Sequence, residues 1–467
     1  MAQPIYLTRE VRRIEQAAGN VSPPLMERAG AAAAELAARL VSDRAKDVLV
    51  LAGPGNNGGD ARVVARLLEE RFFRVTLASA PEEVPPDRRW TLVVDGLFGI
   101  GLARAPEGPY AKLIALANEQ RCPVLSLDVP SGLESDTGCV LGHAVRATHT
   151  ITFIAMKPGL LTLDGPDHCG AVSVADLGIE PAKLVAPEGW VAATELFADA
   201  LKPRPRNFHK GQAGSLCILG GAAGMVGAAL LAGRAALALG AGRVYVGLLA
   251  PDAPAVDAGA PELMLRHPDE ALGMELDAIV VGPGLGQSER SETLVAAALA
   301  SDIPCVLDAD ALNLVAENKD LKQACTRRRA DTLLTPHPAE AARLLEAKTS
   351  DVQQDRRTAA QRLARQFNAH VVLKGAGSVI VARDGHWFIN ATGNSGMASA
   401  GMGDVLSGLL GALLAQGYTG EAALVLGVHL HGAAADELVR TGTGPVGIAA
   451  GELIAPARKL WNRWLAA

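Results

Sequence analysis

Residues 48–70 read VLVLAGPGNNGGDARVVARLLEE, and this stretch decides the fold of the first half of the chain. An apolar run is followed by a glycine-rich segment and then by apolar residues at helical spacing. This order predicts a buried strand, a tight loop and a helix, which is the repeating unit of a parallel sheet covered on both faces. The same order returns at residues 215–239, SLCILGGAAGMVGAALLAGRAALAL.

Short apolar runs alternate with helical patterns along the rest of the chain. The runs that we expect to form strands are Val48–Ala52, Val75–Ala78, Leu92–Asp95, Val124–Asp128, Thr150–Phe153, Leu216–Leu219, Val244–Leu248, Ala278–Val281, Cys305–Asp308, Thr332–Thr335, Val371–Lys374 and Ser378–Ala382. The helical patterns include Leu25–Leu40, Asp60–Glu70, Tyr110–Glu119, Ala228–Leu239, Ala339–Leu345, Asp355–Phe367 and Asp404–Ala415. The alternation predicts an α/β protein with parallel sheets.

A boundary between two domains is expected near residue 200. The segment Leu201–Lys210, LKPRPRNFHK, is basic, broken by prolines and without apolar periodicity. The rhythm of strand, glycine loop and helix restarts at Ser215. A chain of 467 residues also suggests two or three domains. We therefore expect two α/β domains, residues 1–203 and 204–467.

The composition disfavours several classes of protein. Hydrophobic residues make up 49% and the net charge is −6, so the chain is not of the disordered class, and its acidic balance disfavours general binding of nucleic acid or of an anionic membrane. Six cysteines without a C-x-x-C pair indicate neither a zinc site nor a disulfide framework. The start, MAQPIYLTREVRRIEQ, lacks an apolar signal region, so a cytoplasmic location is expected. The uncharged stretch Gly211–Gly233 is long enough to span a membrane, but its glycines favour strand, turn and helix.

The first glycine-rich segment has two interpretations. Gly53, Gly55 and Gly58 match G-x-G-x-x-G, the loop of a Rossmann NAD-dependent oxidoreductase. That interpretation needs an acidic residue at the end of the second strand to hold a ribose hydroxyl. Here the strand ends in Leu-Ala-Ser-Ala at residues 77–80, and the Asn-Asn-Gly-Gly-Asp core adds groups that a pyrophosphate does not need. The sequence therefore disfavours the dehydrogenase.

Polar side chains follow successive strands of the first half. The residues at or just beyond these strand ends are Asn57, Asp95, Asp128, Ser131 and Lys157. Ligands of open α/β sheets bind outside the carboxyl ends of the strands, so these side chains are expected to converge on one site. Any one of them alone would be better explained as a helix or turn cap.

The motifs GPGNNGGD, VVDGLFGIGL, LDVPSGL and FIAMKPGL, with LMERAG before them, resemble the NAD(P)H-hydrate epimerase domain, the YjeF N-terminal family, over residues 5–190. The resemblance implies a Rossmann-like three-layer α/β sandwich. It also implies a substrate, NADHX or NADPHX, whose hydrated nicotinamide ring carries a hydroxyl at C6 beside N1. The family usually has glycine after Gly-Gly-Asp, whereas this chain has Ala61, which we expect to crowd the start of the helix.

Epimerisation at C6 requires proton transfer at one oxygen, whether the ring opens or the hydroxyl leaves. We assign this proton transfer to Asp128 as a hypothesis, with Lys157 as its electrostatic partner. The resemblance implies a potassium ion, for which the oxygen ligands would be Asn57, Asp95 and Ser131. The residues implied to wrap the dinucleotide are Asn56, Asn57, Gly58, Gly59, Asp60, Gly99, Ile100, Gly101, Leu102, Ala103, Arg104 and Ala105.

The second half carries its strongest signal at residues 390–414, NATGNSGMASAGMGDVLSGLLGALL. A long loop of small residues ends in Gly401-Met402-Gly403-Asp404 at a helix start, where free N–H groups and the helix dipole attract an anion. A carboxylate as base beside oriented donors suits phosphoryl transfer to an alcohol. Asp404 could instead only cap the helix, worth about 1 kcal/mol. Capping does not explain the flanking glycines, so we favour the catalytic role.

The motifs HKG, GGAAGMVGA, GPGLG, LDADALN, TPHPAE, KGAGS and GMGDVLSG resemble the ribokinase-like superfamily and, within it, NAD(P)H-hydrate dehydratase, over residues 205–465. The residues implied to contact the hydrate are Gly284, His337 and Asp404, with Asp310 and Glu340 lining the site. Glu340 is also a candidate to order Mg²⁺ through water. The residues implied to bind the adenine nucleotide are Lys374, Gly375, Ala376, Gly377, Ser378, Asn394, Ser395, Gly396, Met397, Ala398, Ser399, Ala400, Gly401, Met402 and Gly403.

Together the two resemblances predict metabolite repair. A nucleotide would phosphorylate the C6 hydroxyl, a poor leaving group, and the N1 lone pair would then expel phosphate and restore NADH or NADPH. Fusion of the domains resembles the arrangement that uses ADP, although no residue selects ADP over ATP. Two alternatives remain: a kinase for a sugar or a hydroxymethylpyrimidine with a regulatory first domain, and a first domain that only binds. A homo-oligomer is expected, but no residue pattern selects its size.

Overall fold

The computed structural model describes residues 2–19, 21–41 and 47–466. The chain divides into two compact units, Gln3–Trp190 and Val191–Ala467, the second joined by Ala2. The division lies before the expected boundary at residues 203 and 204. The N–H of Ala192 donates to the carbonyl of Ile389 at 2.9 Å, which attaches the segment after Trp190 to the second unit.

The first unit contains a six-stranded sheet in the order β3-β2-β4-β5-β6-β7, with every neighbouring pair parallel. Its strands are β2 (Asp47–Ala52), β3 (Arg74–Ala78), β4 (Leu92–Gly96), β5 (Val124–Leu127), β6 (His149–Phe153) and β7 (Ala171–Ala175). A short strand β1 (Pro4–Ile5) pairs antiparallel with β8 (Gly189–Val191). The helices are α1 (Thr8–Ala18), α2 (Leu25–Leu40), α3 (Asn56–Glu70), α4 (Pro109–Glu119), α5 (Gly165–Cys169) and α6 (Pro181–Leu184).

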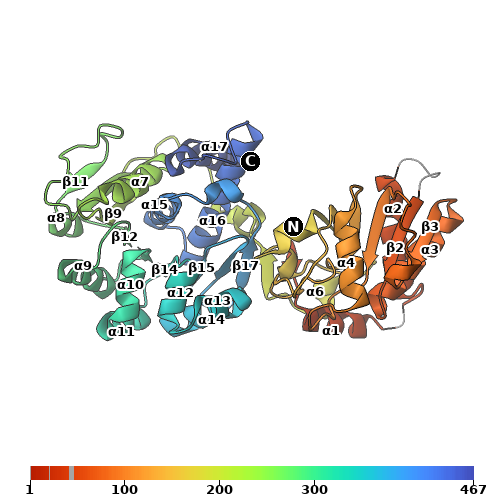
Figure 1. Ribbon diagram of the computed structural model, residues 1–467. Coiled ribbons are helices and arrows are strands. Elements are labelled where there is room, and N and C mark those ends of the chain that lie inside the picture. The colour runs from red at the N-terminus through yellow and green to blue at the C-terminus, as the bar shows by residue number, and fades with distance from the viewer. Residues whose placement is uncertain (1, 20, 42–46, 467) are drawn as a thin grey trace. The chain divides into compact units, whose positions relative to one another are not determined.

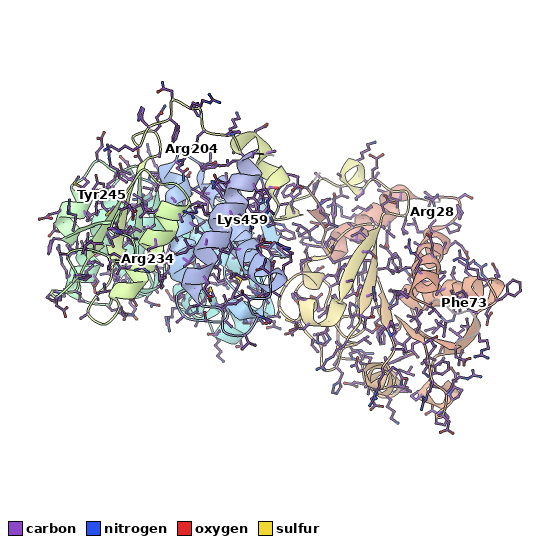
Figure 2. All side chains as sticks on the ribbon, turned by 90° about the horizontal axis from the view of Figure 1, so that it is seen from above. Arg28, Phe73, Arg204, Arg234, Tyr245 and Lys459 are labelled. Carbon is purple, nitrogen blue, oxygen red and sulfur yellow. The ribbon has the colours of Figure 1, made fainter. Side chains whose placement is uncertain are left out.

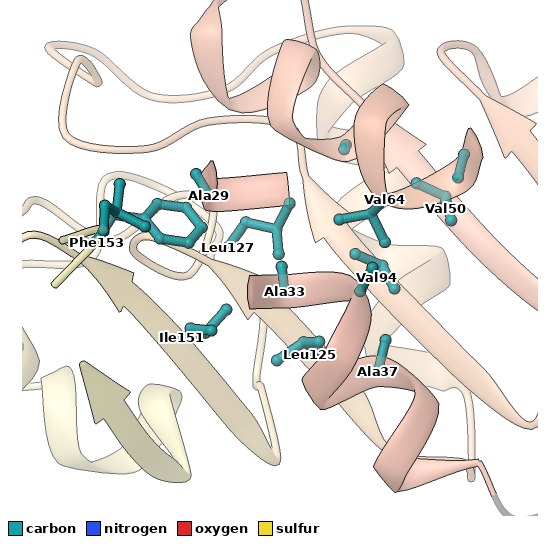
Figure 3. Close-up of a cluster of buried hydrophobic side chains, with 14 of the residues drawn as sticks. Ala29, Ala33, Ala37, Val50, Val64, Val94, Leu125, Leu127, Ile151 and Phe153 are labelled. Carbon is teal, nitrogen blue, oxygen red and sulfur yellow. The ribbon is translucent and has the colours of Figure 1, made fainter. Parts of the chain in front are cut away.

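The alternation of side chains along β2 builds two separate cores. Val48 and Val50 pack with residues of α1, α2 and α3 on one face of the sheet, in the cluster drawn in Figure 3. Leu49 and Leu51 pack on the other face with Leu113 of α4. Both faces of a parallel strand are buried, which is why its sequence is continuously apolar. The first unit is therefore the three-layer α/β sandwich that the sequence predicts.

The second unit contains strands in the order β17-β16-β15-β14-β13-β12-β9-β10-β11. Their bounds are β9 (Ser215–Gly220), β10 (Arg243–Leu248), β11 (Met264–Arg266), β12 (Ala278–Val281), β13 (Cys305–Leu307), β14 (Thr332–Leu334), β15 (His370–Leu373), β16 (Ser378–Val381) and β17 (Trp387–Asn390). Pairing is parallel from β11 to β15 but antiparallel for β15–β16 and β16–β17. This corrects the expectation of parallel pairing throughout. Only residues 374–377 join β15 to β16, and a parallel pair needs a crossover of about a dozen residues or more.

Two groups of helices contact this sheet (Figure 1). One group comprises α7 (Val226–Ala238), α15 (Met402–Ala415), α16 (Gly420–Arg440) and α17 (Ile454–Ala466). The other comprises α9 (Glu289–Ala300), α10 (Asp310–Glu317), α11 (Lys319–Arg327), α12 (Pro338–Leu344), α13 (Thr349–Gln354) and α14 (Arg356–Phe367), and the short α8 (Pro268–Leu272) contacts β9 and β10. Contacts run within each group, so the helices form two layers and the α/β prediction is confirmed.

Helix α16 is long and apolar enough to cross a membrane by length and composition, but 67% of that window is buried inside the structure, as in the core helix of a folded domain. The stretch Gly211–Gly233 forms β9, a turn and the beginning of α7, as expected.

Arginine side chains fasten loops to these layers, and three of them are labelled in Figure 2. Arg28 of α2 donates to the carbonyls of Pro23 and Leu177 at 2.9 and 2.8 Å. Arg234 of α7 makes an ion pair with Asp257, whose side chain is 4% exposed. Because each guanidinium can bond two or more acceptors in one plane, these contacts fix the loops at defined positions.

Candidate active sites

A buried lysine and an aspartate meet at the carboxyl edge of the first sheet. The Lys157 ammonium is fully buried and donates to Asp128 Oδ1 at 2.7 Å, to Thr152 Oγ1 at 2.8 Å and to the Phe153 carbonyl at 2.6 Å. Its three donor protons therefore have three acceptors, which is what allows a charge to remain inside the unit.

The backbone conformation and hydrogen bonds of Asp128 fix the position of its carboxylate. Asp128 follows β5 with a φ of 65°, a conformation that a non-glycine residue adopts only under constraint. Its N–H donates to the Ile151 carbonyl at 2.8 Å, and its Oδ2 accepts the N–H of Ile100 at 3.1 Å. A Cβ added at Gly99 would lie 2.8 Å from that same Oδ2, so glycine is required where the loop passes the carboxylate.

These groups line a cavity of about 290 Å³. Of the residues expected to wrap the substrate, Asn56, Asn57, Asp60, Gly99, Ile100, Gly101 and Leu102 line it together with Asp128 and Lys157. The cavity is not lined by Gly58, Gly59, Ala103, Arg104 or Ala105. A Cβ at Gly58 or Gly59 would instead meet the Gly53 carbonyl or the Met26 side chain, so these two glycines serve the packing of the helix start.

Two polar side chains at the start of α3 are buried without partners. Neither side-chain atom of Asn57 has a hydrogen-bond partner among the described residues. The Asp60 carboxyl is 9% exposed, and no hydrogen bond joins it to the part of the chain that the structure describes. Burial raises the pKa of Asp60 to about 8, and the charges of Asp128 and Glu15 add to the rise. Buried polar groups are normally satisfied, so these two side chains are candidates to bind a ligand.

Helix α1 contributes residues to this cavity that were not expected from the sequence. Arg12 and Glu15 line the same cavity as Asp128, with Val11 beside them. They lie far from the glycine loop in the sequence, and no motif accompanied them. Their only signal was an amphipathic pattern in TREVRRIEQ.

Asp95 is fully buried beneath this cavity and completely hydrogen-bonded. Its oxygens accept from Ser126 Oγ at 2.8 Å, from Ser131 Oγ at 2.6 Å and from the Ser131 N–H at 2.9 Å. Burial raises the pKa of Asp95, although these hydrogen bonds oppose the rise. With the unpartnered Asn57 oxygen, Asp95 and Ser131 make a set of hard oxygen donors that suits an alkali cation. Both Asp95 oxygens already accept hydrogen bonds, and the Asn57 oxygen is the member of this set without a partner among the described residues, so the cation site stays a prediction.

Ala61 does not crowd the first turn of α3, because the helix begins at Asn56, earlier than the expected Asp60. Its methyl group is buried and points at β4, where a Cβ added at Gly96 would lie 2.5 Å from it. The pair Ala61 and Gly96 thus packs helix against strand.

The second site centres on a buried Asp308 and Lys374. Lys374 Nζ donates to Asp308 Oδ1 at 2.8 Å, and that oxygen also accepts Thr335 Oγ1 at 2.7 Å. Asp308 Oδ2 accepts Ser407 Oγ at 2.8 Å. Burial alone would raise the pKa of Asp308, but the Lys374 charge and the hydrogen bonds from Lys374, Thr335 and Ser407 together outweigh it, and the pKa falls. Burial alone would lower the pKa of Lys374, but Asp308 and the other carboxylates outweigh it and the pKa rises.

Asp404 lies in the first turn of α15, beside this pair. Gly401 precedes the helix with a φ of 88°, and α15 begins at Met402. A Cβ added at Gly403 would lie 3.3 Å from Lys374 Nζ and 3.5 Å from Asp308 Oδ2, so the glycine leaves the ammonium accessible at the helix start. Burial raises the pKa of Asp404 to about 6, with Asp308 adding to the rise and Lys374 opposing it.

His337 and Glu340 form a capping box at the start of α12. His337 Nδ1 accepts the N–H of Ala339 at 3.1 Å, while Glu340 Oε2 accepts the His337 N–H at 2.7 Å. His337 Nε2 lies 3.3 Å from Glu340 Oε1. Burial lowers the pKa of His337 and raises that of Glu340, so both shifts weaken a charged pair. The geometry gives His337 a structural role that its motif did not predict.

The glycine loops of this unit meet at two turns. Gly284 has a φ of 57°, and a Cβ there would lie 2.7 Å from the Met225 carbonyl. Ala222 donates its N–H to the Gly284 carbonyl at 2.7 Å. Asp310 begins α10, and its Oδ2 accepts the N–H of Gly286 at 2.8 Å. These bonds hold the loops after β9, β12 and β13 together.

The segments expected to bind a nucleotide lie in two loops. Lys374–Ser378 joins β15 to β16, and Arg356 supports it from α14 by donating to the Ala376 carbonyl at 2.5 Å. Asn394 begins the second loop, where its Nδ2 donates to Asp436 Oδ1 at 2.9 Å. Ser399 Oγ donates to the Ile448 carbonyl at 3.1 Å. The residues from Ser395 to Ala400 are partly or fully exposed, as a ligand-binding loop requires.

Comparisons with known proteins agree on both units. The profile of the family described as NAD(P)H-hydrate dehydratase matches residues 216–454, and that of the YjeF-related protein N-terminus matches residues 22–91 and 80–159. A bifunctional NAD(P)H-hydrate repair enzyme of Escherichia coli is 38% identical over 98% of this chain and 94% of its own length. The chain belongs to the bifunctional NAD(P)H-hydrate repair enzyme family. A second member, from Coxiella burnetii, is 37% identical over 98% of this chain and 99% of its own.

One solved structure resembles the second unit. It is an ADP/ATP-dependent NAD(P)H-hydrate dehydratase from Bacillus subtilis, co-crystallised with ATP and Mg²⁺. It is 30% identical, with a TM-score of 0.51, and covers 59% of this chain and 98% of its own. The family assignment thus extends over both units by sequence and over the second also by structure.

Proposed function

We propose that this chain repairs hydrated reduced nicotinamide nucleotides in two steps, one in each unit. The first unit interconverts the R and S forms of NADHX or NADPHX, and the second dehydrates the S form at the expense of a nucleotide. The observation that carries the proposal is the pair of carboxylate–lysine centres, Asp128 with Lys157 and Asp308 with Lys374, in a chain that matches bifunctional repair enzymes over its whole length.

Epimerisation is assigned to the cavity around Asp128. Asp128 lines the cavity, while Lys157 holds its Oδ1 and keeps the group in place. Asp128 would move the proton of the C6 hydroxyl, which lets the configuration at C6 be lost and regained. The loop from Gly99 to Leu102 and the start of α3 would hold the dinucleotide. The N–H groups of Gly99, of Gly101 and of the first turn of α3 have no acceptor among the described residues and could meet its phosphates.

Asn57, Asp95 and Ser131 would hold a potassium ion in this unit. Bound there, the ion would supply a fixed positive charge beside the substrate. The support is the set of hard oxygen atoms and the buried, unpartnered amide of Asn57.

Dehydration is assigned to the second centre. The loops at Lys374–Ser378 and Asn394–Gly403 would bind the nucleotide, with the Lys374 ammonium and the first N–H groups of α15 at its phosphates. A pKa of about 6 leaves Asp404 mostly ionised at neutral pH, so it can take the proton of the C6 hydroxyl. The C6 oxygen then bonds to the terminal phosphorus, and the nucleotide leaves one phosphate shorter.

Restoration of the ring follows from the new leaving group. The N1 lone pair expels phosphate as the C6–O bond breaks, and loss of a proton from C5 restores the double bond. Glu340 is the candidate to order the water of a magnesium ion, which would neutralise phosphate charge. Its carboxylate is buried and already bonded to the His337 N–H, so it would act through water.

The decisive experiment supplies purified protein with both epimers of NADHX and follows the return of reduced-nicotinamide absorbance with ADP, with ATP and with neither. Recovery of both epimers with one nucleotide supports both activities and identifies the donor, which we propose to be ADP. Recovery that stops when one epimer is consumed refutes the epimerase. The kinase alternative is favoured if neither nucleotide restores the absorbance and the protein instead forms a stable phosphorylated product from a sugar or a hydroxymethylpyrimidine.

A further inference from the structure

Asp308 is a buried carboxylate with three side-chain donors, yet no step of the proposed reaction involves it. It is 1% exposed, and three side chains from three different elements donate to it. Lys374 follows β15, Thr335 follows β14 and Ser407 lies in α15. A buried carboxylate that collects three donors is a rigid anchor, because each bond to a charged acceptor is strong and directional.

Two of the three partners of Asp308, Lys374 and Ser407, are linked to different groups of the proposed reaction: the nucleotide phosphates and the base. Lys374 provides the cation for the nucleotide phosphates. Ser407 lies three residues after Asp404 on α15, so it shares one face of the helix with the proposed base. One carboxylate therefore holds the cation through Oδ1 and the helix of the base through Oδ2.

The backbone at Gly403 agrees with this arrangement. A Cβ there would lie 3.3 Å from Lys374 Nζ, which is a tight contact, and 3.5 Å from Asp308 Oδ2, which is an ordinary one. The ion pair thus sits directly against the first turn of α15, with no side chain between it and the N–H groups of that turn.

We propose that Asp308 is the positioning residue of the dehydratase centre, which fixes the Lys374 ammonium and the Asp404 helix at one separation. This inference rests on the proposed function of the second unit. Asp308 contacts neither substrate and acts through Lys374 and Ser407. A misplacement of about 1 Å between reacting groups can lower a rate by about 100-fold.

The proposal predicts what happens when the Asp308 charge is removed. Asp404 faces Asp308, Lys374 and Asp310. Without Asp308, the ammonium is drawn toward the remaining carboxylates, Glu340 and Asp404. Pairing with Asp404 would occupy the base and move the cation from the transferred phosphoryl group, while the loops that hold the nucleotide remain intact.

The test uses the full chain with Asp308→Asn, an isosteric change that removes the charge and leaves one acceptor oxygen in place of two. We expect kcat for dehydration of the S epimer to fall about 100-fold, with KM for the nucleotide changed less than about threefold. The acid limb of the kcat profile should move to lower pH, because Asp404 loses a neighbouring negative charge. Asp302→Asn, an exposed aspartate just before β13, is the matched control and should leave both constants unchanged.

Three further readouts keep the result decisive. Scanning calorimetry of the second unit measures the folded fraction, and epimerisation by the first unit in the same preparation measures the amount of intact chain. Ser407→Ala keeps the ion pair and frees α15, so it should lower kcat by a smaller factor, about tenfold, without moving the acid limb. Asp308→Glu, which keeps the charge but displaces it, should retain the limb of the wild type.

The contrary results are equally clear. An unshifted acid limb in Asp308→Asn, or equal losses in kcat and in the folded fraction, would mean a purely structural role and overturn the inference. A wild-type chain that dehydrates neither epimer would instead overturn the proposed function itself.

Discussion

Replacement of the Asp128–Lys157 pair tests the first site most sharply, because the double variant should recover stability without recovering activity. The Lys157 ammonium is fully buried and has acceptors only in Asp128, Thr152 and the Phe153 carbonyl among the described residues. Asp128→Asn removes the only carboxylate in direct contact with it there. A charged lysine then remains inside the unit without a counterion.

The size of the effect follows from burial. Removal of one partner of a buried ion pair costs about 3–5 kcal/mol. For a unit the size of Gln3–Trp190, each kcal/mol lowers the midpoint of unfolding by about 2–4 °C, so Asp128→Asn should lower it by about 6–20 °C. The double variant Asp128→Asn with Lys157→Met removes both charges and should recover most of this loss.

Activity should not recover with stability. Loss of the acid–base group should slow epimerisation by about 10²–10⁴. Scanning calorimetry of the full chain follows the unfolding of the first unit. The approach of an R-enriched sample to the epimer mixture, with dehydration by the second unit as the internal control, follows the activity.

The refuting results are specific. A double variant no more stable than Asp128→Asn would show that the ammonium is not held by the carboxylate. Full epimerisation by a folded Asp128→Asn chain would remove the residue from the reaction.

Three other variants test the remaining assignments. Asp404→Asn should slow dehydration about 10²–10⁴-fold while epimerisation continues. In the wild type, kcat should fall as the pH drops through about 6, because Asp404, whose raised pKa is about 6, must be ionised to act as the base. An acid limb far from that pH would argue against this base. Gly403→Ala places a methyl group 3.3 Å from Lys374 Nζ, so kcat measured at saturating nucleotide should fall about tenfold with an unchanged melting temperature. Asn57→Leu should leave the unfolding midpoint equal or higher, because both amide atoms lack hydrogen-bond partners among the described residues. In the same variant, added KCl should no longer change the rate of epimerisation. Retained potassium dependence would exclude Asn57 as a ligand.

Local periodicity was enough to find the elements that bury their apolar residues. The expected helix Leu25–Leu40 and the expected strand Ala278–Val281 have the bounds that the structure gives. The helix starts were placed too late at Asp60 and Asp404, because the glycines before them suggest a loop. The first N–H groups of a helix have no acceptor within the helix, so a helix can begin inside a glycine-rich segment that resembles a loop in the sequence.

The first site was found in large part from strand ends. Asp128 and Lys157 converge as expected, since parallel strands bring their carboxyl ends to one edge. Arg12 and Glu15 were missed, because α1 reaches the cavity only through tertiary packing. His431, buried in α16 with an unpartnered Nε2 among the described residues and a pKa lowered by burial to about 4, gave no signal in its apolar helix.

The sequence by itself determined the alternation of strands and helices, the two domains and the motifs that identify the family, because these depend on the order of residues along the chain. Only the tertiary structure decided which side chains satisfy one another. In the sequence, Asp308 is one of several aspartates at strand ends. Its three donors, Thr335, Lys374 and Ser407, are far from it along the chain. Side-chain hydrogen bonds reach about 3 Å, so partners this far apart in sequence become partners only when the sheet and α15 have packed.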